Sequence, residues 1–361
     1  MSDIIDYKCP CCGGSIEFNT EGQNMKCPYC DTEFDVSAML ENDEALNDTD
    51  TDEITWESGS EGEFSEEDGV GLYVCESCGG QIVCDENTAA TSCPYCDSPV
   101  MLTGRLKGDL KPDIVIPFKL DKNEAKAGFL KHLKGKKLLP KAFKSEAHIE
   151  EIKGIYAPFW LYDADAEAKI RYHATKTRFW SDSNYNYTET RHYALVREGV
   201  LGFDNVPVDG SVKLDDSLMD SIEPYDFSQA VDFQTAFLSG FLADKYDVSS
   251  EESSCRATER IKQSTSNAFA STTIGYSSAY PERSVIKTTS GRVRYALLPV
   301  WLMTTDWQGK KYTFAMNGQT GKFVGDLPMD KGAFIKYLSL FFGISASVSM
   351  LGLYLLSLLL W

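Results

Sequence analysis

A duplicated pattern of cysteines constrains the fold of this chain more than any other feature of its sequence. Residues 7–31 match residues 73–97 without a gap: each copy reads Tyr-x-Cys-x-x-Cys-Gly-Gly-x-Ile and then Cys-Pro-Tyr-Cys-Asp. Self-similarity at a fixed offset indicates that one small structural module occurs twice. Both copies have the spacing C-x2-C-x14-C-x2-C, and the cysteines involved are Cys9, Cys12, Cys27, Cys30, Cys75, Cys78, Cys93 and Cys96.

The chemistry that suits this spacing is metal binding. Each Cys-x-x-Cys turn directs two sulfurs toward one tetrahedral centre, and the intervening residues are enough for a small hairpin that returns the second pair. A redox-active pair is the alternative interpretation, but four pairs in two matched sets favour two structural zinc ribbons, each holding one Zn2+. Four cysteine ligands leave no coordination position for water, so we expect no catalytic metal.

Three further cysteines fall outside the pattern. Cys11 lies inside the first Cys-x-x-Cys turn, where it is an alternative ligand. Cys84 occupies the position that Phe18 holds in the first copy, so we interpret it as a small buried hydrophobe rather than a ligand. Cys255 is expected on the buried side of an amphipathic helix, together with Ile261 and Phe269.

Charge is distributed very unevenly along the chain. The net charge of -19 argues against binding a polyphosphate as the main activity. Residues 41–68 hold 13 carboxylates and no Lys or Arg, which predicts an extended, flexible acidic linker over residues 38–72. Residues 105–144 instead hold 12 Lys or Arg against 4 acids, a basic face that the acidic linker could mask.

Residues 105–328 are predicted to form a mostly antiparallel, β-rich α+β domain. Asp121 and Glu124 form a capping-box pattern that opens a helix through about residue 134. Residues 156–161 are similar to residues 297–302, which favours a duplicated β unit. Strands are expected at 114–118, 156–162, 168–177, 185–200, 201–203, 293–306 and 311–324, with a hairpin turn near 317–321 and a helix over 247–270.

The sequence contains no recognisable catalytic motif. The sequence lacks a phosphate-binding loop, a dinucleotide fingerprint, a nucleophile elbow and an H-E-x-x-H motif. Three tryptophans could form a platform on which nucleic-acid bases stack, but their packing in the core of a sheet is favoured: Trp160, Trp301 and Trp307. The four histidines are interpreted as surface or strand residues rather than acids or bases: His132, His148, His173 and His192.

The C-terminal residues 337–361 contain no charged side chain. As a helix they would rise about 37 Å, more than the roughly 30 Å hydrocarbon core, which fits one tilted crossing. Lys331 and Lys336 precede this span, so the positive-inside rule predicts a tail-anchored, single-pass protein of the inner membrane with its bulk in the cytoplasm. Gly343 and Ser347 would allow oligomerisation through the helix; a lone anchor or a buried soluble helix are the alternatives.

The predicted organisation is therefore multidomain. It consists of zinc ribbon 1 (1–37), the acidic linker (38–72), zinc ribbon 2 (73–104), the α+β domain (105–328), a juxtamembrane segment (329–336) and a transmembrane helix (337–361).

Several strings resemble a known bacterial family. They are the N-terminal four-cysteine ribbon, Ile-Tyr-Ala-Pro-Phe-Trp-Leu-Tyr-Asp at 155–163, Leu-Pro-Val-Trp-Leu at 298–302, and Tyr-Thr-Phe-Ala-Met-Asn-Gly-Gln-Thr-Gly-Lys at 312–322 with Gly-Asp-Leu-Pro at 325–328. The family is that of TFIIB-type zinc-ribbon membrane proteins, often labelled primosomal (PriA-like) helicases, a label that the missing phosphate-binding loop does not support here. The resemblance implies action with flotillin-like (SPFH) and phage-shock-type (PspA-like) proteins in envelope-stress complexes.

Three classes of function follow. The first is a non-enzymatic, zinc-binding adaptor that recruits protein partners to the membrane. The alternative is a zinc-ribbon protein that binds nucleic acid without ATPase activity, for which affinity should fall steeply with salt. The third is an enzyme hidden in the α+β domain, for which the sequence offers no constellation of residues.

Overall fold

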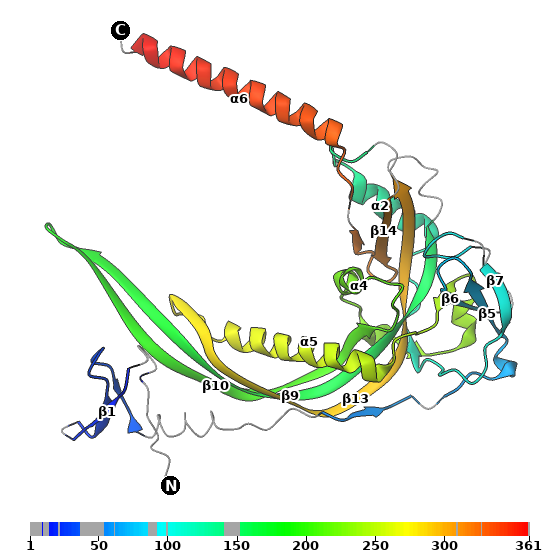
Figure 1. Ribbon diagram of the computed structural model, residues 1–361, viewed down its shortest axis with the longest axis horizontal. Helices are drawn as coiled ribbons and strands as arrows, with labels where there is room; N and C mark the ends of the chain where they lie inside the picture. The colour runs from blue at the N-terminus through cyan, green and yellow to red at the C-terminus, as the bar shows by residue number, and fades with distance from the viewer. Residues whose placement is uncertain are drawn as a thin grey trace. The chain divides into compact units, whose positions relative to one another are not determined.

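The computed structural model describes residues 9, 14–20, 22–36, 54–60, 62–85, 92–98, 100–140, 152–307, 310–325 and 327–359 (Figure 1). The chain divides into two compact units, each built from three stretches of sequence. Unit 1 comprises Met1–Gly59, Leu161–Val208 and Ser250–Val293, and unit 2 comprises Ser60–Trp160, Asp209–Ser249 and Arg294–Trp361. The α+β domain predicted over residues 105–328 therefore contributes to both units.

Three long strands explain this division, because each continues from one unit into the other. They are β9 (Lys153–Ser181), β10 (Asn186–Asp209) and β13 (Ser278–Trp307). The sequence predicted several shorter strands in these regions. The strand β9 continues through residues 163–168 because Asp-Ala-Asp-Ala-Glu-Ala alternates polar and apolar side chains, and its alanines are buried while Asp165 and Glu167 are exposed.

Unit 1 contains the first cysteine module and a helix packed on the long strands. The module is a three-stranded antiparallel sheet of β1 (Glu17–Asn19), β2 (Asn24–Lys26) and β3 (Glu33–Phe34). The helix α5 (Ser250–Ser271) runs alongside the strands (Figure 1) and buries Ile261 and Phe269, as the amphipathic pattern predicted, and also Ala257. Cys255, predicted on the buried side, is exposed, because the buried stripe instead uses the small residue Ala257.

Part of the predicted flexible linker has regular structure. Within residues 38–72, the strand β4 (Trp56–Ser58) pairs in parallel with β13 in unit 1. In unit 2, Phe64 is buried, a 3-10 helix η1 (Glu66–Asp68) follows, and β5 (Val70–Cys75) begins. Apolar side chains interspersed among the acids give these segments a surface to bury, so the linker prediction fails for them. Residues 37–53 lie outside the described part of the chain.

Unit 2 is organised around a mixed, mostly antiparallel sheet. Its strands follow the order β11-β8-β13-β9-β12-β6-β5-β7, and β14 pairs with both β13 and β15. The pairs β12–β9 and β13–β8 are parallel. The remaining elements are β6 (Gln81–Asp85), β7 (Val100–Arg105), β8 (Ile114–Val115), α2 (Lys122–Leu133), α4 (Asp216–Ile222), η3 (Phe227–Gln229), β11 (Val231–Asp232), η4 (Thr235–Leu238), β12 (Leu242–Asp244), β14 (Lys310–Asn317) and β15 (Phe323–Gly325).

Local signals in the sequence account for several of these boundaries. Asp121 caps α2 through hydrogen bonds from the backbone amides of Asn123 and Glu124, and the Glu124 side chain completes the capping box. The predicted hairpin turn joins β14 and β15, where Gly321 adopts a φ of +76°. These two predictions from sequence are confirmed.

The two similar β segments make matching hydrogen bonds in unit 2. The backbone N–H of Gly210, after β10, donates to the carbonyl of Pro158 at 2.8 Å, and that of Gly318, after β14, donates to Pro299 at 2.8 Å. In both cases, the glycine that directly follows the paired strand donates a hydrogen bond to the proline carbonyl of the first strand. This correspondence agrees with the predicted duplication of a β unit.

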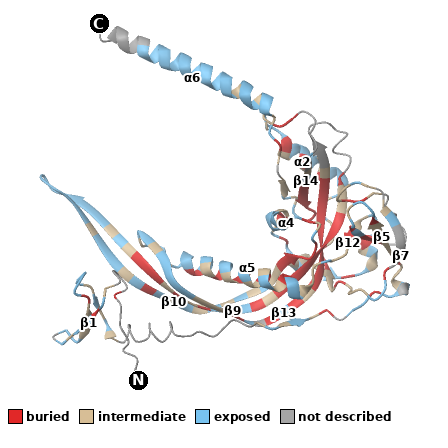
Figure 2. Ribbon diagram, in the orientation of Figure 1, coloured by how far each residue is buried: buried red, intermediate tan, exposed pale blue. Residues whose placement is uncertain are grey.

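The aromatic residues of these segments belong to the protein core. Tyr156, Trp160 and Trp301 are buried, in the region of unit 2 where Figure 2 shows buried residues along β9 and β13. The indole N–H of Trp160 donates to the Val248 carbonyl at 2.9 Å, and that of Trp301 donates to the Leu120 carbonyl at 3.2 Å. They form packed core contacts, so the base-stacking interpretation does not apply to them.

The last element is a single long apolar helix. The helix α6 (Lys331–Leu359) starts at Lys331, so residues 331–336 of the segment predicted as juxtamembrane belong to its first turns. The Asp330 side chain caps it by accepting hydrogen bonds from Gly332 and Ala333 at 2.8 and 3.0 Å. By length and composition, its residues Lys331–Leu353 can cross a membrane, and no part of this window is buried in the protein.

Candidate metal centres

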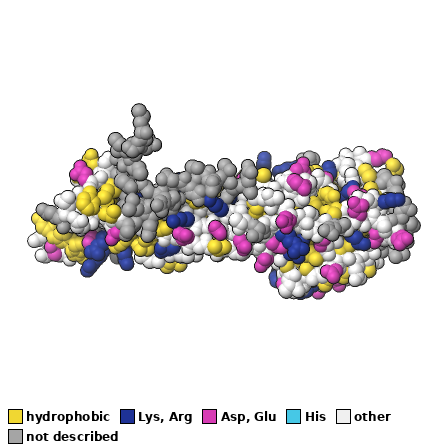
Figure 3. All heavy atoms as spheres, turned by 90° about the horizontal axis from the view of Figure 1, so that it is seen from below, with side chains coloured by type: hydrophobic (Ala, Val, Ile, Leu, Met, Phe, Trp, Pro, Cys, Tyr) yellow, Lys and Arg dark blue, Asp and Glu magenta, His cyan; other side chains and the backbone are white. Residues whose placement is uncertain are grey.

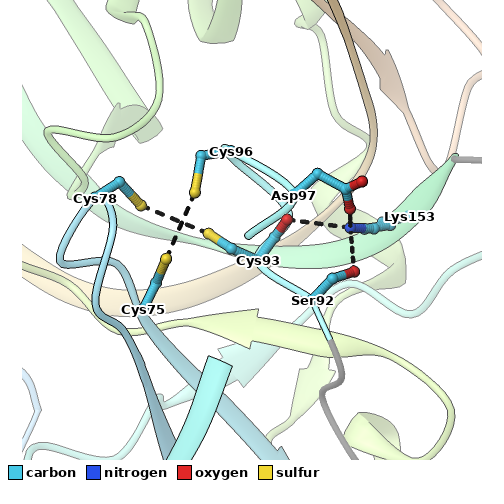
Figure 4. A network of polar contacts seen from close by, with 7 residues as sticks. All are labelled: Cys75, Cys78, Ser92, Cys93, Cys96, Asp97 and Lys153. Atoms are coloured by element: carbon cyan, nitrogen blue, oxygen red, sulfur yellow. Dashed lines mark hydrogen bonds and ion pairs between the residues drawn. The ribbon is translucent and has the colours of Figure 1, made fainter. Parts of the chain in front are cut away.

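The second cysteine module brings its four predicted ligands together in unit 2. The Sγ atoms of Cys75, Cys78, Cys93 and Cys96 all lie within 4.8 Å of one another (Figure 4). Cys75 and Cys96 are 3.5 Å apart and Cys78 and Cys93 are 3.6 Å apart, and none forms a disulfide. A tetrahedral centre with Zn–S bonds near 2.3 Å requires S···S separations of about 3.8 Å. The cluster can therefore hold one metal ion.

Backbone hydrogen bonds shape the turns that carry these ligands. In the first turn, the Cys75 amide donates to the Gly80 carbonyl at 3.0 Å and Gly79 donates back to Cys75 at 2.8 Å. Gly79 has a φ of +71°, a left-handed torsion that glycine adopts without steric cost. In the second turn, Asp97 takes the equivalent torsion with a φ of +59° and donates to the Cys93 carbonyl at 3.0 Å.

The first module repeats this arrangement for the three ligands that are described. The Sγ atoms of Cys9, Cys27 and Cys30 lie within 4.8 Å of one another, and Cys9 and Cys30 are 3.6 Å apart. The amide of Asp31, at a φ of +55°, donates to the Cys27 carbonyl at 2.9 Å, as Asp97 does in the second module. The fourth predicted ligand, Cys12, and the alternative ligand, Cys11, lie outside the described residues.

Hydrogen bonds within the second turn of each module favour a thiolate. In the first module, the Thr32 hydroxyl, 3.1 Å from the Cys30 sulfur, is the main cause that lowers the pKa of Cys30 to about 6. In the second module, burial raises the pKa of Cys96, but hydrogen bonds from the equivalent Ser98, together with those from Cys75 and Cys78, outweigh it and lower the value to about 6. A thiolate is the form that binds metal, so these hydroxyls prepare one ligand in each module.

Burial acts in the opposite direction on two ligands of the second module. Loss of solvation raises the pKa of Cys93 strongly and that of Cys78 more moderately. Cys9 and Cys27 of the first module are buried, as are their counterparts Cys75 and Cys93. The described ligands of the two clusters differ at the last cysteine, because Cys30 is exposed whereas Cys96 is partly buried.

A lysine distant in sequence connects the second module to the sheet. The Nζ of Lys153, the first residue of β9, donates to the Ser92 hydroxyl at 2.6 Å and to the Cys93 carbonyl at 3.1 Å (Figure 4). It also forms an ion pair with Asp97. Sequence reasoning missed this contact, because nothing near Lys153 marks a partner some 60 residues away.

In the first module, the equivalent aspartate pairs with a lysine of the same module. Lys26, which occupies the position of Ser92, lies 3.4 Å from Asp31, the counterpart of Asp97. The first module thus supplies its own cation, whereas the second receives one from β9.

The other candidate residues give a mixed outcome. Cys84 is buried beside Cys75 and Cys93, which confirms its predicted role as a small hydrophobe. Two of the four histidines contact each other: the ring nitrogens Nε2 of His173 and Nδ1 of His192 are 3.0 Å apart. Burial lowers the pKa of His132, with a further contribution from Lys136, and His148 lies outside the described residues.

Comparison with known proteins places the chain in a family. No protein-family model and no solved structure matches it. It is 35% identical over 338 residues to the uncharacterized protein YdjG of Bacillus subtilis (strain 168), an alignment that covers 93% of this chain and 94% of the relative. The chain belongs to the family of Bacillus subtilis YdjG.

Proposed function

We propose that the protein is a non-enzymatic, zinc-binding adaptor that α6 anchors in the inner membrane and that recruits protein partners there. The observation that carries this proposal is α6 itself: a helix apolar enough to span a bilayer has no buried part in the window that would cross it. Exposing such a surface to water is very unfavourable, so a membrane is its natural surrounding.

The separation of sulfurs supports zinc as the metal. Four thiolates in tetrahedral proximity suit Zn2+, which needs no redox chemistry and prefers sulfur and nitrogen ligands. Each site would be filled by cysteines alone, so the ion would stabilise the fold without activating water. This arrangement favours an adaptor over a metalloenzyme.

The orientation follows from charge and redox chemistry. Lys331 and Lys336 lie in the first turns of α6, and basic residues flanking a span favour the cytoplasmic side. Free thiols also persist best in the reducing cytoplasm. We therefore assign unit 1 and the part of unit 2 that precedes α6 to the cytoplasmic face of the membrane.

Ribbon 1 (the described residues of 9–36) is the proposed recruiting surface. It exposes 74% of Tyr29 and 49% of Phe18, a large apolar area for a module with so small a core. The partner classes implied by the sequence resemblance, flotillin-like (SPFH) and PspA-like proteins, are the ones we propose it binds.

The test is affinity capture of the full chain from detergent-solubilised membranes. Wild type is compared with Cys27→Ser, which removes a ligand of ribbon 1, and with Cys255→Ser as a control at an exposed cysteine outside both clusters. The proposal expects partners of an SPFH or PspA-like class with wild type and the control, and their loss with Cys27→Ser. Identical partner sets for all three proteins contradict it, and capture that depends on nucleic acid and falls steeply with salt would favour the alternative function.

A further inference from the structure

The end of the β9–β10 hairpin in unit 1 exposes an unusual number of aromatic side chains. Phe179 is 73% and Tyr185 is 67% exposed, and Trp180 and Tyr187 are also exposed. Large aromatic rings gathered at one solvent-exposed point mark an interaction site, since single exposed hydrophobes are common but clusters are not.

The hairpin end is built to hold these rings in place. Trp180 on β9 and Tyr187 on β10 stack at 5.4 Å between ring centroids with planes 11° apart. The Asp182 carboxylate accepts hydrogen bonds from the amides of Asn184 and Tyr185, both at 2.8 Å, and from the Tyr187 hydroxyl at 2.9 Å. The turn is therefore closed by its own contacts, although the stacked rings remain exposed.

The aromatic residues occupy both faces of the hairpin. Side chains alternate along a strand, so Trp180 shares a face with Arg178, whose guanidinium lies 5.6 Å from the Trp180 ring centroid. Phe179, between them in sequence, must project from the opposite face. A partner with a flat surface would cover one face only, whereas a lipid surface into which the hairpin dips covers both.

Charge favours an anionic lipid surface. Of the six Lys or Arg between residues 169 and 197, three pair with acids: Lys169 with Glu198, Arg171 with Glu282 and Arg191 with Glu189. The basic side chains relevant to a lipid surface are the two nearest the hairpin end. Lys176 and Arg178 are exposed next to the aromatic end. Figure 3 shows hydrophobic side chains gathered at the left end of one face, with basic and some acidic side chains beside them.

We infer that the end of the β9–β10 hairpin is a second membrane contact, in which Phe179, Trp180 and Tyr185 enter the interfacial layer of a bilayer rich in anionic phospholipid. Tryptophan and tyrosine are the side chains most enriched at this layer, where an apolar ring and a polar edge are both accommodated. Lys176 and Arg178 face the phosphate groups. The inference rests on the proposed function, because α6 brings the chain to a membrane.

Photolabelling of the full-length protein tests the contact. The protein is reconstituted into vesicles of phosphatidylethanolamine and phosphatidylglycerol that contain a trace of diazirine-bearing phospholipid, and adducts are mapped by mass spectrometry. We expect adducts on α6 and on residues 178–187. Replacing phosphatidylglycerol by phosphatidylcholine should lower labelling of 178–187 about fivefold for each basic side chain at the surface, and leave α6 unchanged.

Two variants sharpen the result. The double variant Phe179→Ser, Trp180→Ser should lose most labelling of the hairpin while α6 stays labelled. Ile274→Ser, which removes an exposed apolar side chain of unit 1 outside the hairpin, should change neither.

The outcomes separate the two proposals. Adducts on α6 without adducts on 178–187, or hairpin labelling indifferent to lipid charge, overturn the inference and leave the anchor in place. Hairpin adducts without α6 adducts overturn the anchor alone, and absence of both overturns both. A photoreactive residue at position 179 that cross-links in cells to a polypeptide rather than to lipid would assign this site to a protein partner instead.

Discussion

The two cysteine modules share a sequence pattern and a backbone geometry, yet they are used differently. Ribbon 1 forms a small sheet of its own, and Lys26 supplies the cation for its aspartate. Ribbon 2 (the described residues of 70–105) places β6 between β5 and β12, and its aspartate is paired with Lys153 of β9. One motif thus serves as a self-contained module in unit 1 and as part of a sheet in unit 2.

Equivalent side chains show the same contrast. Tyr29 packs on Gly14 and is exposed, whereas its counterpart Tyr95 packs on Gly80 and has a buried hydroxyl. Where ribbon 1 exposes an aromatic ring at position 18, ribbon 2 has a fully buried cysteine. Loss of metal should therefore remain local in ribbon 1 but spread through the sheet in ribbon 2.

The largest difference should come from removing one ligand of each site. Cys93→Ser should destabilise unit 2 by more than about 4 kcal/mol, because structural zinc supplies apparent folding free energies of about 10 kcal/mol or more in small domains. Cys27→Ser should unfold ribbon 1 and leave unit 2 unchanged. Denaturant titration followed by hydrogen exchange of β9 and β12 measures both effects.

The control for this pair is Cys255→Ser, which should have the stability of wild type because the side chain is exposed and outside both clusters. Equal loss of protection in β12 for Cys27→Ser and Cys93→Ser would show that the two modules are not used differently.

Truncating the paired tyrosines should give the next largest contrast. Tyr95→Ala removes a ring that packs on Gly80, beside the first Cys-x-x-Cys turn, and should cost about 2–3 kcal/mol in the free energy of unfolding of unit 2. Tyr29→Ala should change stability by less than about 0.5 kcal/mol, since its ring is largely in solvent. Thermal unfolding in detergent compares them; similar losses for the two variants would contradict the assignment.

Replacing the two lysines should have a smaller effect. Lys153→Met breaks hydrogen bonds to Ser92, Cys93 and Asp97, and should cost about 1–2 kcal/mol and speed metal release from ribbon 2. Lys26→Met removes a solvent-exposed pair and should cost less than about 0.5 kcal/mol. The rate of metal release from each variant, measured with a chromogenic chelator, tests this. A larger increase in the release rate for Lys26→Met than for Lys153→Met would refute it.

The rate of thiol alkylation should distinguish an exposed cysteine of ribbon 1 from a buried cysteine of ribbon 2, and this comparison needs no destabilising substitution. The lowered pKa of about 6 keeps Cys30 mostly thiolate at pH 7 and its side chain is exposed, so a short pulse of alkylating agent on the folded protein should modify it first, and about tenfold more slowly at pH 5. Burial raises the pKa of Cys93, so this thiol should react slowly at both pH values while unit 2 stays folded. Mass spectrometry of partially alkylated protein gives the order, and early reaction at Cys93 would be inconsistent with its burial.

Local patterns predicted much of the fold and of the metal sites. Cysteine spacing identified the cysteines that the structure brings into two clusters, Asp121 and Glu124 identified the start of α2, and the glycine-containing turn identified the β14–β15 hairpin. In each case the residues that form the feature are near one another in sequence, so their chemical types are sufficient evidence.

Long-range contacts could not be predicted in this way. The pairing of β12 with β6 depends on residues 242–244 and 82–83, and short strands of this kind carry no distinctive pattern. The acidic composition around Trp56 hid a strand that pairs with β13 and packs its tryptophan against Tyr162 of β9. The alternation over 163–168 was visible in the sequence, but the flanking aromatic runs were assigned to separate strands.

The most direct test of this account is hydrogen exchange of the zinc-loaded, full-length protein during stepwise addition of a chelator. The account predicts two stages: ribbon 1 peptides lose protection first, while β12 and the first residues of β9 remain protected, and these strands then open together with ribbon 2 as the second ion leaves. Simultaneous release of both ions, or departure of the second without exposure of β12, would contradict it.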